Sequence, residues 1–326
     1  MTSEVFAEAL KTRFGAQYKE GELLARHLNF RIGGPAKYFV EAKSSQDVID
    51  AVAIAREHQI EFFILGGGSN TLVSDQGFEG FVIKAANRGI KIDGTTLYAE
   101  AGVISALAAR KSAELGLRGF EWAISLPGTI GGAVRGNAGC FGGETKDNIV
   151  SATVLHANGS VSEVLAKDLH FGYRHSIFKE LGNTDVVLAA TFALVQGTKE
   201  EATALLEKNL QSRKATQPMG SASAGCMFKN FEFSSEEMIA KIAKDADIPE
   251  AMLKNKRIAA GWIIDQLGLK GLRVGDAQVS DEHGNFLMNV GHATAEDIAM
   301  LISRIKTRVR DEYDINLEEE VRFVGI

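Results

Sequence analysis

Cysteine is scarce in this chain, with two residues among 326. Cys140 and Cys226 each lie in a glycine-containing segment and belong to no spaced set, so the sequence predicts free thiols and no disulfide scaffold. Histidine shows no metal-binding pattern either, because no H-x-x-x-H or H-E-x-x-H spacing places two ligands on one helix face. We therefore expect no metal site.

Long apolar runs and basic runs are also absent. No stretch approaches the roughly 18 apolar residues of a membrane span, and the residues after Met1 lack the basic start and apolar core of a signal peptide. The net charge is −6, and the chain has no run of Lys and Arg residues that could replace the counterions of nucleic-acid phosphates. We expect a globular, cytoplasmic protein that binds neither membrane nor nucleic acid. Its oligomeric state is left open by the composition, with a monomer favoured.

Glycine, by contrast, is plentiful and concentrated in two loops. Residues 66–70 read G-G-G-S-N, and residues 127–134 read P-G-T-I-G-G-A-V. Glycine has no Cβ, so its amide can approach a diphosphate closely, and successive amides form an anion-binding concavity or open a helix. Neither loop fits the G-x-G-x-x-G or G-x-x-x-x-G-K-[ST] spacing. Glycines also serve tight turns, but two such loops favour one extended nucleotide cofactor.

The first loop follows a predicted β-α-β unit. Residues 38–42 and 62–65 read as strands, and between them Ser44 and Asp47 have the spacing of a capping box that opens a helix. This order places Gly66–Asn70 at the carboxyl end of a strand, where ligands of α/β sheets tend to bind.

Strands and helices continue to alternate along the rest of the chain. We expect strands over 80–84, 96–100, 149–156, 186–195, 286–290 and 317–324, and helices over 104–115, 198–213, 234–245, 258–267 and from Thr294 onward. The apolar stripe of the last helix is typical of ordinary core. Residues 217–225 are small and polar, which is typical of a linker or an active-site loop, and composition does not separate the two.

Several short motifs follow one another in a set order over about residues 22–326. They are F-R-I-G-G-P at 30–35, the two glycine loops, N-A-G at 137–139, Y-R-H-S at 173–176, Q-P at 217–218, G-C-M-F-K-N at 225–230 and L-E-E-E-V-R-F at 317–323. Each motif alone is a weak signal, but the order over nearly the whole chain is specific. This ordered set resembles the UDP-N-acetylenolpyruvoylglucosamine reductases, the MurB family.

The resemblance implies an α+β fold with an FAD-binding, PCMH-type (vanillyl-alcohol-oxidase-like) region and a C-terminal α/β substrate domain. We expect FAD-binding subdomains at 1–85, joined by the C-terminal strand 316–326, and at 86–213, followed by a substrate domain at 214–315. The implied cofactors are FAD and NADPH. The cofactor-binding positions carried over are Gly66, Gly67, Gly68, Ser69, Asn70, Pro127, Gly128, Thr129, Gly131, Gly132, Ala133, Asn137 and Gly139.

The implied reaction reduces UDP-N-acetylglucosamine enolpyruvate to UDP-N-acetylmuramate, a cytoplasmic step of peptidoglycan synthesis. Hydride addition to the enolpyruvyl methylene develops negative charge next to a carboxylate, and Arg174 matches the family position of the stabilising cation. The family proton donor is a serine, and this chain has Cys226 there. A thiol with a pKa of about 8.5 is still largely protonated near neutral pH, so it can donate a proton. Glu320 matches the remaining catalytic position.

Lys229 and Asn230 match substrate-contacting positions of the family. We expect Tyr173 to border the same pocket and His283 to contact the substrate, because it lies in D-E-H-G-N-F at 281–286, which resembles the family's H-A-N-F stretch. A cation at Lys229 suits the UDP diphosphate. The chain has no tyrosine between Ser176 and Arg213, which resembles the subtype that lacks the tyrosine-bearing substrate loop.

Several alternatives stay open. Cys226 can be an inert small residue with water as the proton donor, and Glu320 can orient the enol or relay a proton. At the level of function, an FAD-dependent oxidase of the same fold or a catalytically silent nucleotide-binding module would keep the glycine loops. Neither requires Arg174, Cys226 and Glu320 together.

Overall fold

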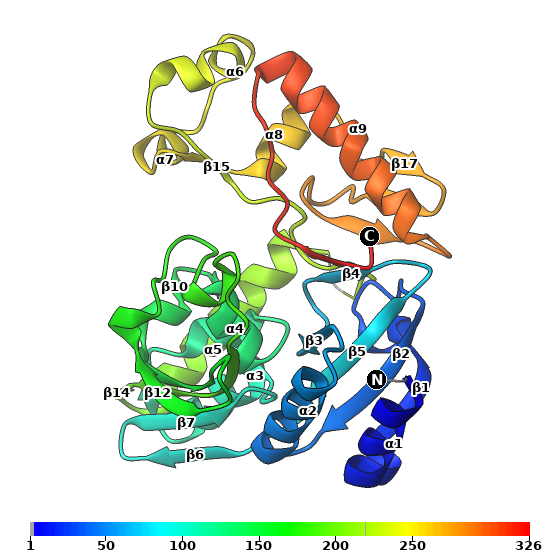
Figure 1. Ribbon diagram of the computed structural model, residues 1–326. Helices are drawn as coiled ribbons and strands as arrows, with labels where there is room; N and C mark the ends of the chain where they lie inside the picture. Colours follow the sequence, from blue (N-terminus) through cyan, green and yellow to red (C-terminus); the bar gives the residue numbers. More distant parts are fainter. Residues whose placement is uncertain (1–2, 219) are drawn as a thin grey trace. The chain divides into compact units, whose positions relative to one another are not determined.

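A computed structural model describes residues 3–218 and 220–326 and has the α+β architecture expected from the sequence (Figure 1). The start of the chain at Met1 and Thr2, and Met219 in the expected linker, lie outside the described residues. The chain divides into two compact units, between which it passes several times. Unit 1 comprises Met1–Glu22, Ala36–Gly67 and Glu79–Ala215, and unit 2 comprises Leu23–Pro35, Gly68–Phe78 and Thr216–Ile326.

Unit 1 begins with a four-stranded sheet in the order β1-β2-β5-β3. Helices α1 and α2 contact each other and share a buried cluster with this sheet, which includes Phe6, Val52 and Phe81. Strands β2 and β3 are the two strands of the predicted β-α-β unit. They are not neighbours in the sheet, because β5 lies between them and pairs in parallel with β3. The bounds are α1 Ser3–Phe14, β1 Tyr18–Leu23, β2 Pro35–Ala42, α2 Ser45–Glu57, β3 Phe62–Leu65 and β5 Phe78–Ala85.

A five-stranded antiparallel sheet in the order β12-β11-β13-β7-β6 forms the rest of unit 1. Helices α3, α4 and α5 share a second buried cluster with it, through Ala108, Val134 and Leu206 among others. The bounds are β6 Ile90–Asp93, β7 Thr96–Glu100, α3 Ser105–Glu114, β8 Leu117–Arg118, α4 Ile130–Gly136, β9 Gly139–Cys140, β10 Gly143–Glu144, β11 Ile149–Leu155, β12 Val161–Leu165, β13 Val186–Ala193, β14 Val195–Gln196 and α5 Lys199–Thr216. The subdomain boundary expected at residue 85 stays a prediction.

Unit 2 is built around the long helix α9, which begins after Thr294 as predicted and is opened by a capping box of Thr294 and Asp297. Its apolar stripe is buried in the core of this unit, which confirms that reading. Strand β20 at the end of the chain pairs in parallel with β4. The bounds are β4 Thr71–Val73, β15 Phe231–Glu232, α6 Ala240–Asp245, α7 Glu250–Lys254, β16 Arg257–Ile258, α8 Ala260–Gln266, β17 Arg273–Val274, β18 Ala277–Val279, β19 Leu287–Asn289, α9 Ala295–Tyr313 and β20 Arg322–Val324.

Four expected elements of unit 2 are shorter than predicted. The strand expected over 286–290 is β19 and the helix expected over 258–267 is α8, and two others differ more. The helix expected over 234–245 is a 3-10 turn, Glu236–Ile239, followed by α6. The strand expected over 317–324 is reduced to β20, because only Arg322–Val324 find ladder partners in β4, while Glu319 makes an isolated bridge to Phe228. Alternating burial alone does not reveal how many residues a partner strand pairs with.

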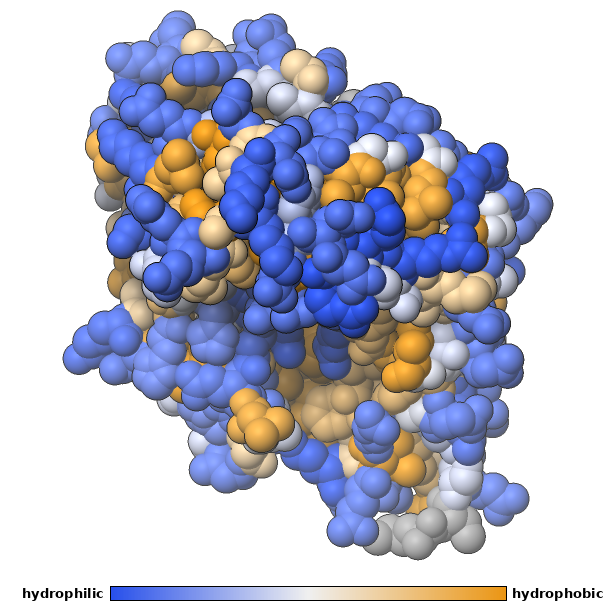
Figure 2. Space-filling view, turned by 90° about the horizontal axis from the view of Figure 1, so that it is seen from above, coloured by the Kyte–Doolittle hydropathy of each residue, from blue (hydrophilic) through white to orange (hydrophobic). Residues whose placement is uncertain are grey.

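None of the helices among the described residues is both long and apolar enough to cross a bilayer. Figure 2 shows hydrophilic residues over most of the face that it presents, with hydrophobic residues in groups between them.

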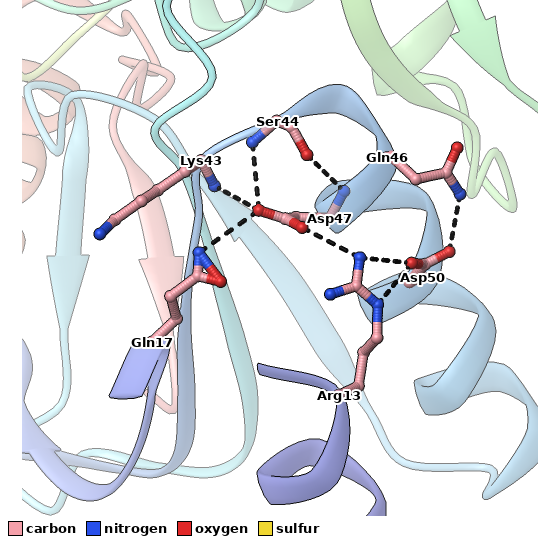
Figure 3. Close-up of polar contacts among 7 residues, drawn as sticks. All are labelled: Arg13, Gln17, Lys43, Ser44, Gln46, Asp47 and Asp50. Carbon is pink, nitrogen blue, oxygen red and sulfur yellow. Dashed lines mark hydrogen bonds and ion pairs between the residues drawn. The ribbon is translucent and has the colours of Figure 1, made fainter. Parts of the chain in front are cut away.

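The N-terminus of α2 is fixed by the capping box that the sequence predicts (Figure 3). The Ser44 hydroxyl accepts from the Asp47 N–H at 3.0 Å, and the Asp47 carboxylate accepts from the backbone N–H groups of Lys43 and Ser44 at 3.0 and 3.2 Å. Arg13 of α1 donates to Asp47 at 3.0 Å and to Asp50 at 2.7 Å. One carboxylate therefore caps α2 and also ties it to α1.

We predict that Ser44→Ala lowers the free energy of unfolding by about 1 kcal/mol, the usual cost of a lost helix cap. Asp47→Ala should cost more, about 2 kcal/mol, because the Arg13 guanidinium also loses an acceptor. Gln46→Ala is the matched control, because Gln46 donates to Asp50 at the exposed face of α2, and should change stability by less than about 0.5 kcal/mol. Urea unfolding measures all three, and equal effects of Asp47→Ala and Gln46→Ala would contradict this account.

Candidate functional site

The two glycine loops meet in unit 1. A Cβ built on Gly67 would lie 2.7 Å from the Cα of Gly128, and one built on Gly66 would lie 2.6 Å from Thr129 Oγ1. No side chain can occupy those places, so the end of β3 touches the second loop through bare backbone. We call this contact, formed by Gly66, Gly67, Gly128 and Thr129, the glycine cradle.

The glycine cradle contains a buried hydroxyl without a partner. Thr129 is 7% exposed, and its Oγ1 has no hydrogen-bond partner among the described residues. Leaving such a group unpaired costs about 1–3 kcal/mol, so a ligand that accepts from it would recover that energy. A buried donor beside glycine backbone suits a phosphate-bearing cofactor.

The second loop leads directly into α4, whose first amides are used within the protein. The Ile130 N–H donates to Val103 O at 2.9 Å, and the Gly131 N–H donates to Ala101 O at 2.9 Å. A Cβ on Gly131 would lie 2.8 Å from the Ala101 Cβ. Gly131 therefore allows α4 to pack closely against the segment after β7, which is a structural reason for glycine at a position expected to bind cofactor.

The remainder of the first loop, Gly68–Asn70, belongs to unit 2. The Asn29 N–H donates to Gly68 O at 2.9 Å. The Asn70 side chain donates to Glu320 O at 3.1 Å, and Asn70 O accepts from the Arg322 N–H at 3.0 Å. The C-terminal segment thus holds this part of the loop, and Asn70 contacts the main chain of a predicted catalytic residue.

Arg174 lies in a tight turn of unit 1. Gly172 and His175 exchange two backbone hydrogen bonds of 3.1 and 3.2 Å, and Arg174 between them has a φ of +54°. The Arg174 guanidinium donates to Gly139 O at 3.1 Å and lies 5.7 Å from the centre of the Tyr173 ring. The structure therefore brings together Tyr173, Arg174 and Gly139, three residues expected at the site.

Cys226 and Glu320 lie on adjoining backbone segments of unit 2. Cys226 makes an isolated bridge to Phe286, and the carbonyl of the next residue, Met227, accepts from the Glu320 N–H at 2.8 Å. Lys229 continues this pairing, since its N–H donates to Glu318 O at 2.8 Å and its ammonium group donates to Glu318 Oε2 at 2.9 Å. Two of the three predicted catalytic residues are thus held beside each other by main-chain hydrogen bonds.

Asn230 and His283 make contacts within unit 2. Asn230 Oδ1 accepts from the Ala260 N–H at 3.2 Å. His283 Nδ1 accepts from the Asn285 N–H at 3.2 Å, and its ring packs against Phe286 with centroids 4.9 Å apart. Burial lowers the pKa of His283, which favours the neutral imidazole. Their substrate contacts stay predictions.

Two residues near the predicted sites were not identified from the sequence. Asn285 is 2% exposed, and its side chain accepts from the Phe228 N–H and donates to Phe228 O, both at 2.8 Å, so it braces the segment that carries Cys226. Cys140 donates to Trp122 O at 3.2 Å, and burial raises the pKa of its thiol to about 11. Cys140 directly follows the N-A-G motif and Asn285 lies two residues after His283, and only the tertiary contacts reveal how each side chain is held.

Two hollows lie away from the predicted site residues, because none of those residues is among the described residues that line them. Unit 2 has a groove of about 790 Å³ that includes Arg31, Asp75 and His292 in its lining. Unit 1 has a smaller one of about 510 Å³, whose lining includes Trp122 and Lys208. No group of acidic, histidine or cysteine side chains among the described residues is arranged to hold a metal ion.

Comparisons with known proteins place the chain among flavin-binding reductases. Residues 36–165 match the family model of an FAD binding domain, and residues 217–324 match that of the UDP-N-acetylenolpyruvoylglucosamine reductase C-terminal domain. The UDP-N-acetylenolpyruvoylglucosamine reductase of Alkaliphilus oremlandii is 38% identical over 93% of this chain and 92% of its own length. The corresponding protein of Chloroflexus aurantiacus is 37% identical over 93% and 96%.

A solved structure agrees with these matches. The crystal structure of the UDP-N-acetylenolpyruvylglucosamine reductase from Thermus caldophilus is similar to this chain with a TM-score of 0.74 at 32% sequence identity. The similarity covers 94% of this chain and 98% of that one. It supports the FAD-binding fold expected from the sequence.

We predict that Gly67→Ala reduces FAD affinity at least about tenfold, because the new methyl group would overlap the backbone of Gly128 and push the two loops apart. Gly136→Ala is the matched control, because nothing lies within 4 Å of a Cβ at that position and alanine favours the helix. The flavin absorbance of the purified variants and a titration of the apoproteins with FAD measure the effect. Full FAD affinity in Gly67→Ala would show that the loops do not need this contact.

The raised pKa of the Cys140 thiol predicts that it reacts slowly with alkylating reagents. In a Cys226→Ser background, iodoacetamide should alkylate Cys140 about a hundredfold more slowly than the same residue in the urea-unfolded chain at pH 7.5. The thiolate fraction falls tenfold for each unit by which the pKa rises above that of an ordinary thiol, and burial also restricts access. Mass spectrometry of timed samples gives both alkylation rates. Equal rates in the folded and unfolded chains would contradict a buried Cys140 thiol with a raised pKa.

Proposed function

Since this chain belongs to the UDP-N-acetylenolpyruvoylglucosamine reductase (MurB) family of FAD-dependent oxidoreductases, we propose that it reduces UDP-N-acetylglucosamine enolpyruvate to UDP-N-acetylmuramate with NADPH. The structural observation that carries the proposal is the glycine cradle, with its unpartnered Thr129 hydroxyl. Its backbone and that hydroxyl would hold FAD. When bound, FAD supplies hydride transfer from NADPH to the enolpyruvyl methylene carbon.

Arg174 is proposed to bind the substrate carboxylate. Reduction of the enolpyruvyl group builds negative charge on the carbon attached to that carboxylate, and a planar, permanently charged guanidinium can stabilise both. The hydrogen bond to Gly139 O and the left-handed turn support this role, because they fix one edge of the guanidinium. A preoriented cation costs little reorganisation when the charge develops.

Cys226 is proposed to protonate the carbon next to the carboxylate. The S–H bond breaks, the new C–H bond takes its proton, and the thiolate regains a proton from solvent. Glu320 is proposed to orient the enol or to relay that proton, and the hydrogen bond between Met227 O and the Glu320 N–H supports an action of both residues on one substrate. Cysteine at the position of the family serine keeps a transferable proton.

The remaining roles complete the proposal. Lys229, Asn230, Tyr173 and His283 are proposed to contact the substrate, with Lys229 exchanging its Glu318 partner for the UDP diphosphate. The chain is proposed to belong to the subtype without the tyrosine-bearing loop. The product, UDP-N-acetylmuramate, places the reaction in cytoplasmic peptidoglycan precursor synthesis, with no metal, membrane or nucleic acid involved.

The function is tested by anaerobic incubation of the FAD-loaded protein with NADPH and UDP-N-acetylglucosamine enolpyruvate. The expected result is a product two hydrogen masses heavier than the substrate, formed in step with NADPH oxidation. Oxygen consumption that depends on a different substrate would instead indicate an FAD-dependent oxidase. Bound FAD that NADPH never reduces would indicate a catalytically silent nucleotide-binding module.

We predict that Cys226→Ala lowers the rate of product formation about a hundredfold or more, the usual contribution of a general acid. Flavin reduction by NADPH should keep the wild-type rate, because that step needs no proton from Cys226. Cys226→Ser is the matched control and should stay within about tenfold of wild type, since a hydroxyl can also donate a proton. Anaerobic stopped-flow absorbance separates the two steps. Wild-type rates for both steps in Cys226→Ala would make Cys226 a packing residue.

A further inference from the structure

We infer that Asn137 is a positioning residue that holds Arg174 in the orientation for carboxylate binding. This inference rests on the proposed function and assigns the preference for a carboxylate-bearing substrate to a buried amide that does not itself touch the substrate. Asn137 is also among the cofactor-binding positions that the resemblance implies, and its side chain makes three hydrogen bonds within unit 1.

Asn137 is fully buried and ends α4. It is 0% exposed and has a left-handed backbone with a φ of +41°. Its side chain donates to Gly172 O at 2.8 Å and to Glu144 Oε2 at 2.7 Å, and its Oδ1 accepts from the Lys146 N–H at 3.0 Å. Both amide hydrogens and the amide oxygen are therefore used inside unit 1.

One of these contacts is made with the turn that carries Arg174. Gly172 opens that turn through its paired bonds with His175, so fixing Gly172 O fixes the start of the turn. Next to this contact, Gly139 O accepts from the Arg174 guanidinium. The two bonds anchor the turn and its side chain on the short segment from Asn137 to Gly139.

A further contact fixes the other end of the turn on the same helix. Ser176, which is 0% exposed, donates from its hydroxyl to Arg135 O at 2.7 Å. The turn is thus attached at Gly172, at the Arg174 side chain and at Ser176, and all three partners lie within residues 135–139. The end of helix α4, Asn137 and Gly139 therefore hold the turn and the side chain of Arg174.

Asparagine meets all the chemical requirements of position 137. The site needs two donors, for Gly172 O and the Glu144 carboxylate, and one acceptor, for the Lys146 N–H. An aspartate would lose both donors and face the Glu144 carboxylate, whereas an apolar residue would leave buried polar groups unpaired. Asparagine also tolerates the left-handed conformation better than most residues.

The test measures a carboxylate preference by binding alone. UDP-N-acetylmuramate carries the lactyl carboxylate and UDP-N-acetylglucosamine lacks it, so the ratio of their dissociation constants for the FAD-loaded, oxidised protein reports the carboxylate contact. Calorimetry on wild type, Asn137→Gly, Arg174→Ala and the double variant completes a double-mutant cycle. Glycine is chosen because it accepts the left-handed backbone while removing the amide.

We expect Asn137→Gly to lower the carboxylate preference at least about tenfold, the worth of one charged hydrogen bond. The double variant should have the preference of Arg174→Ala alone, because Asn137 acts only through Arg174. Thr145→Val is the matched control. Thr145 is also fully buried, and its hydroxyl donates to Ala133 O at 3.1 Å and Ala138 O at 3.0 Å, with no hydrogen bond to the turn among the described residues. It should keep the wild-type preference.

The outcomes separate this inference from the proposed function. If wild type shows no carboxylate preference, or Arg174→Ala retains it, the proposed role of Arg174 fails. If Arg174→Ala loses the preference and Asn137→Gly keeps it, or their effects multiply in the double variant, the positioning inference is wrong. Should Asn137→Gly not fold, Asn137→Asp serves in its place, since it keeps the acceptor for Lys146 and lacks the donor to Gly172. It should lose the preference to the same extent.

Discussion

The contact between the backbone of Gly67 and that of Gly128 is the constraint on which unit 1 depends. Strand β3 belongs to one hydrophobic cluster and helix α4 to another, and the two glycine loops extend from these elements. Because no side chain fits between the loops, the two clusters are joined through bare backbone beside the buried Thr129 hydroxyl, which has no hydrogen-bond partner among the described residues. The same α4 ends at Asn137, so the element that starts at the proposed cofactor site also supports the Arg174 turn.

Unit 2 positions its chemical groups by a different means. Main-chain hydrogen bonds join residues 227–229 to residues 318–320. The Asn285 side chain also forms two hydrogen bonds with the backbone N–H and C=O of Phe228, as a paired strand would. Main-chain hydrogen bonds therefore keep the segment that carries Cys226 beside the segment that carries Glu320.

Local signals in the sequence predicted local structure well. The capping box at Ser44 lies where expected, and the last helix begins after Thr294 as predicted, because a helix start depends on residues only three or four apart. Features set by distant partners were missed. The final strand is short because only three of its residues pair with β4, and β3 pairs with β5, which follows it along the chain.

The site positions came from the family resemblance, and the structure adds how they are held. The motif N-A-G suggested cofactor binding at Asn137, whereas its burial and three hydrogen bonds appear only in three dimensions. In the same way, the sequence marked Gly131 as a cofactor residue without revealing its packing against Ala101.

We propose that the glycine cradle of unit 1 holds the FAD diphosphate, and a crystal structure of the FAD-loaded protein would show where the diphosphate lies. We expect diphosphate oxygens within hydrogen-bond distance of backbone amides of the two glycine loops, with the Thr129 hydroxyl donating to one of them. A diphosphate bound elsewhere, with no partner for the Thr129 hydroxyl, would show that the glycine cradle is not the cofactor site.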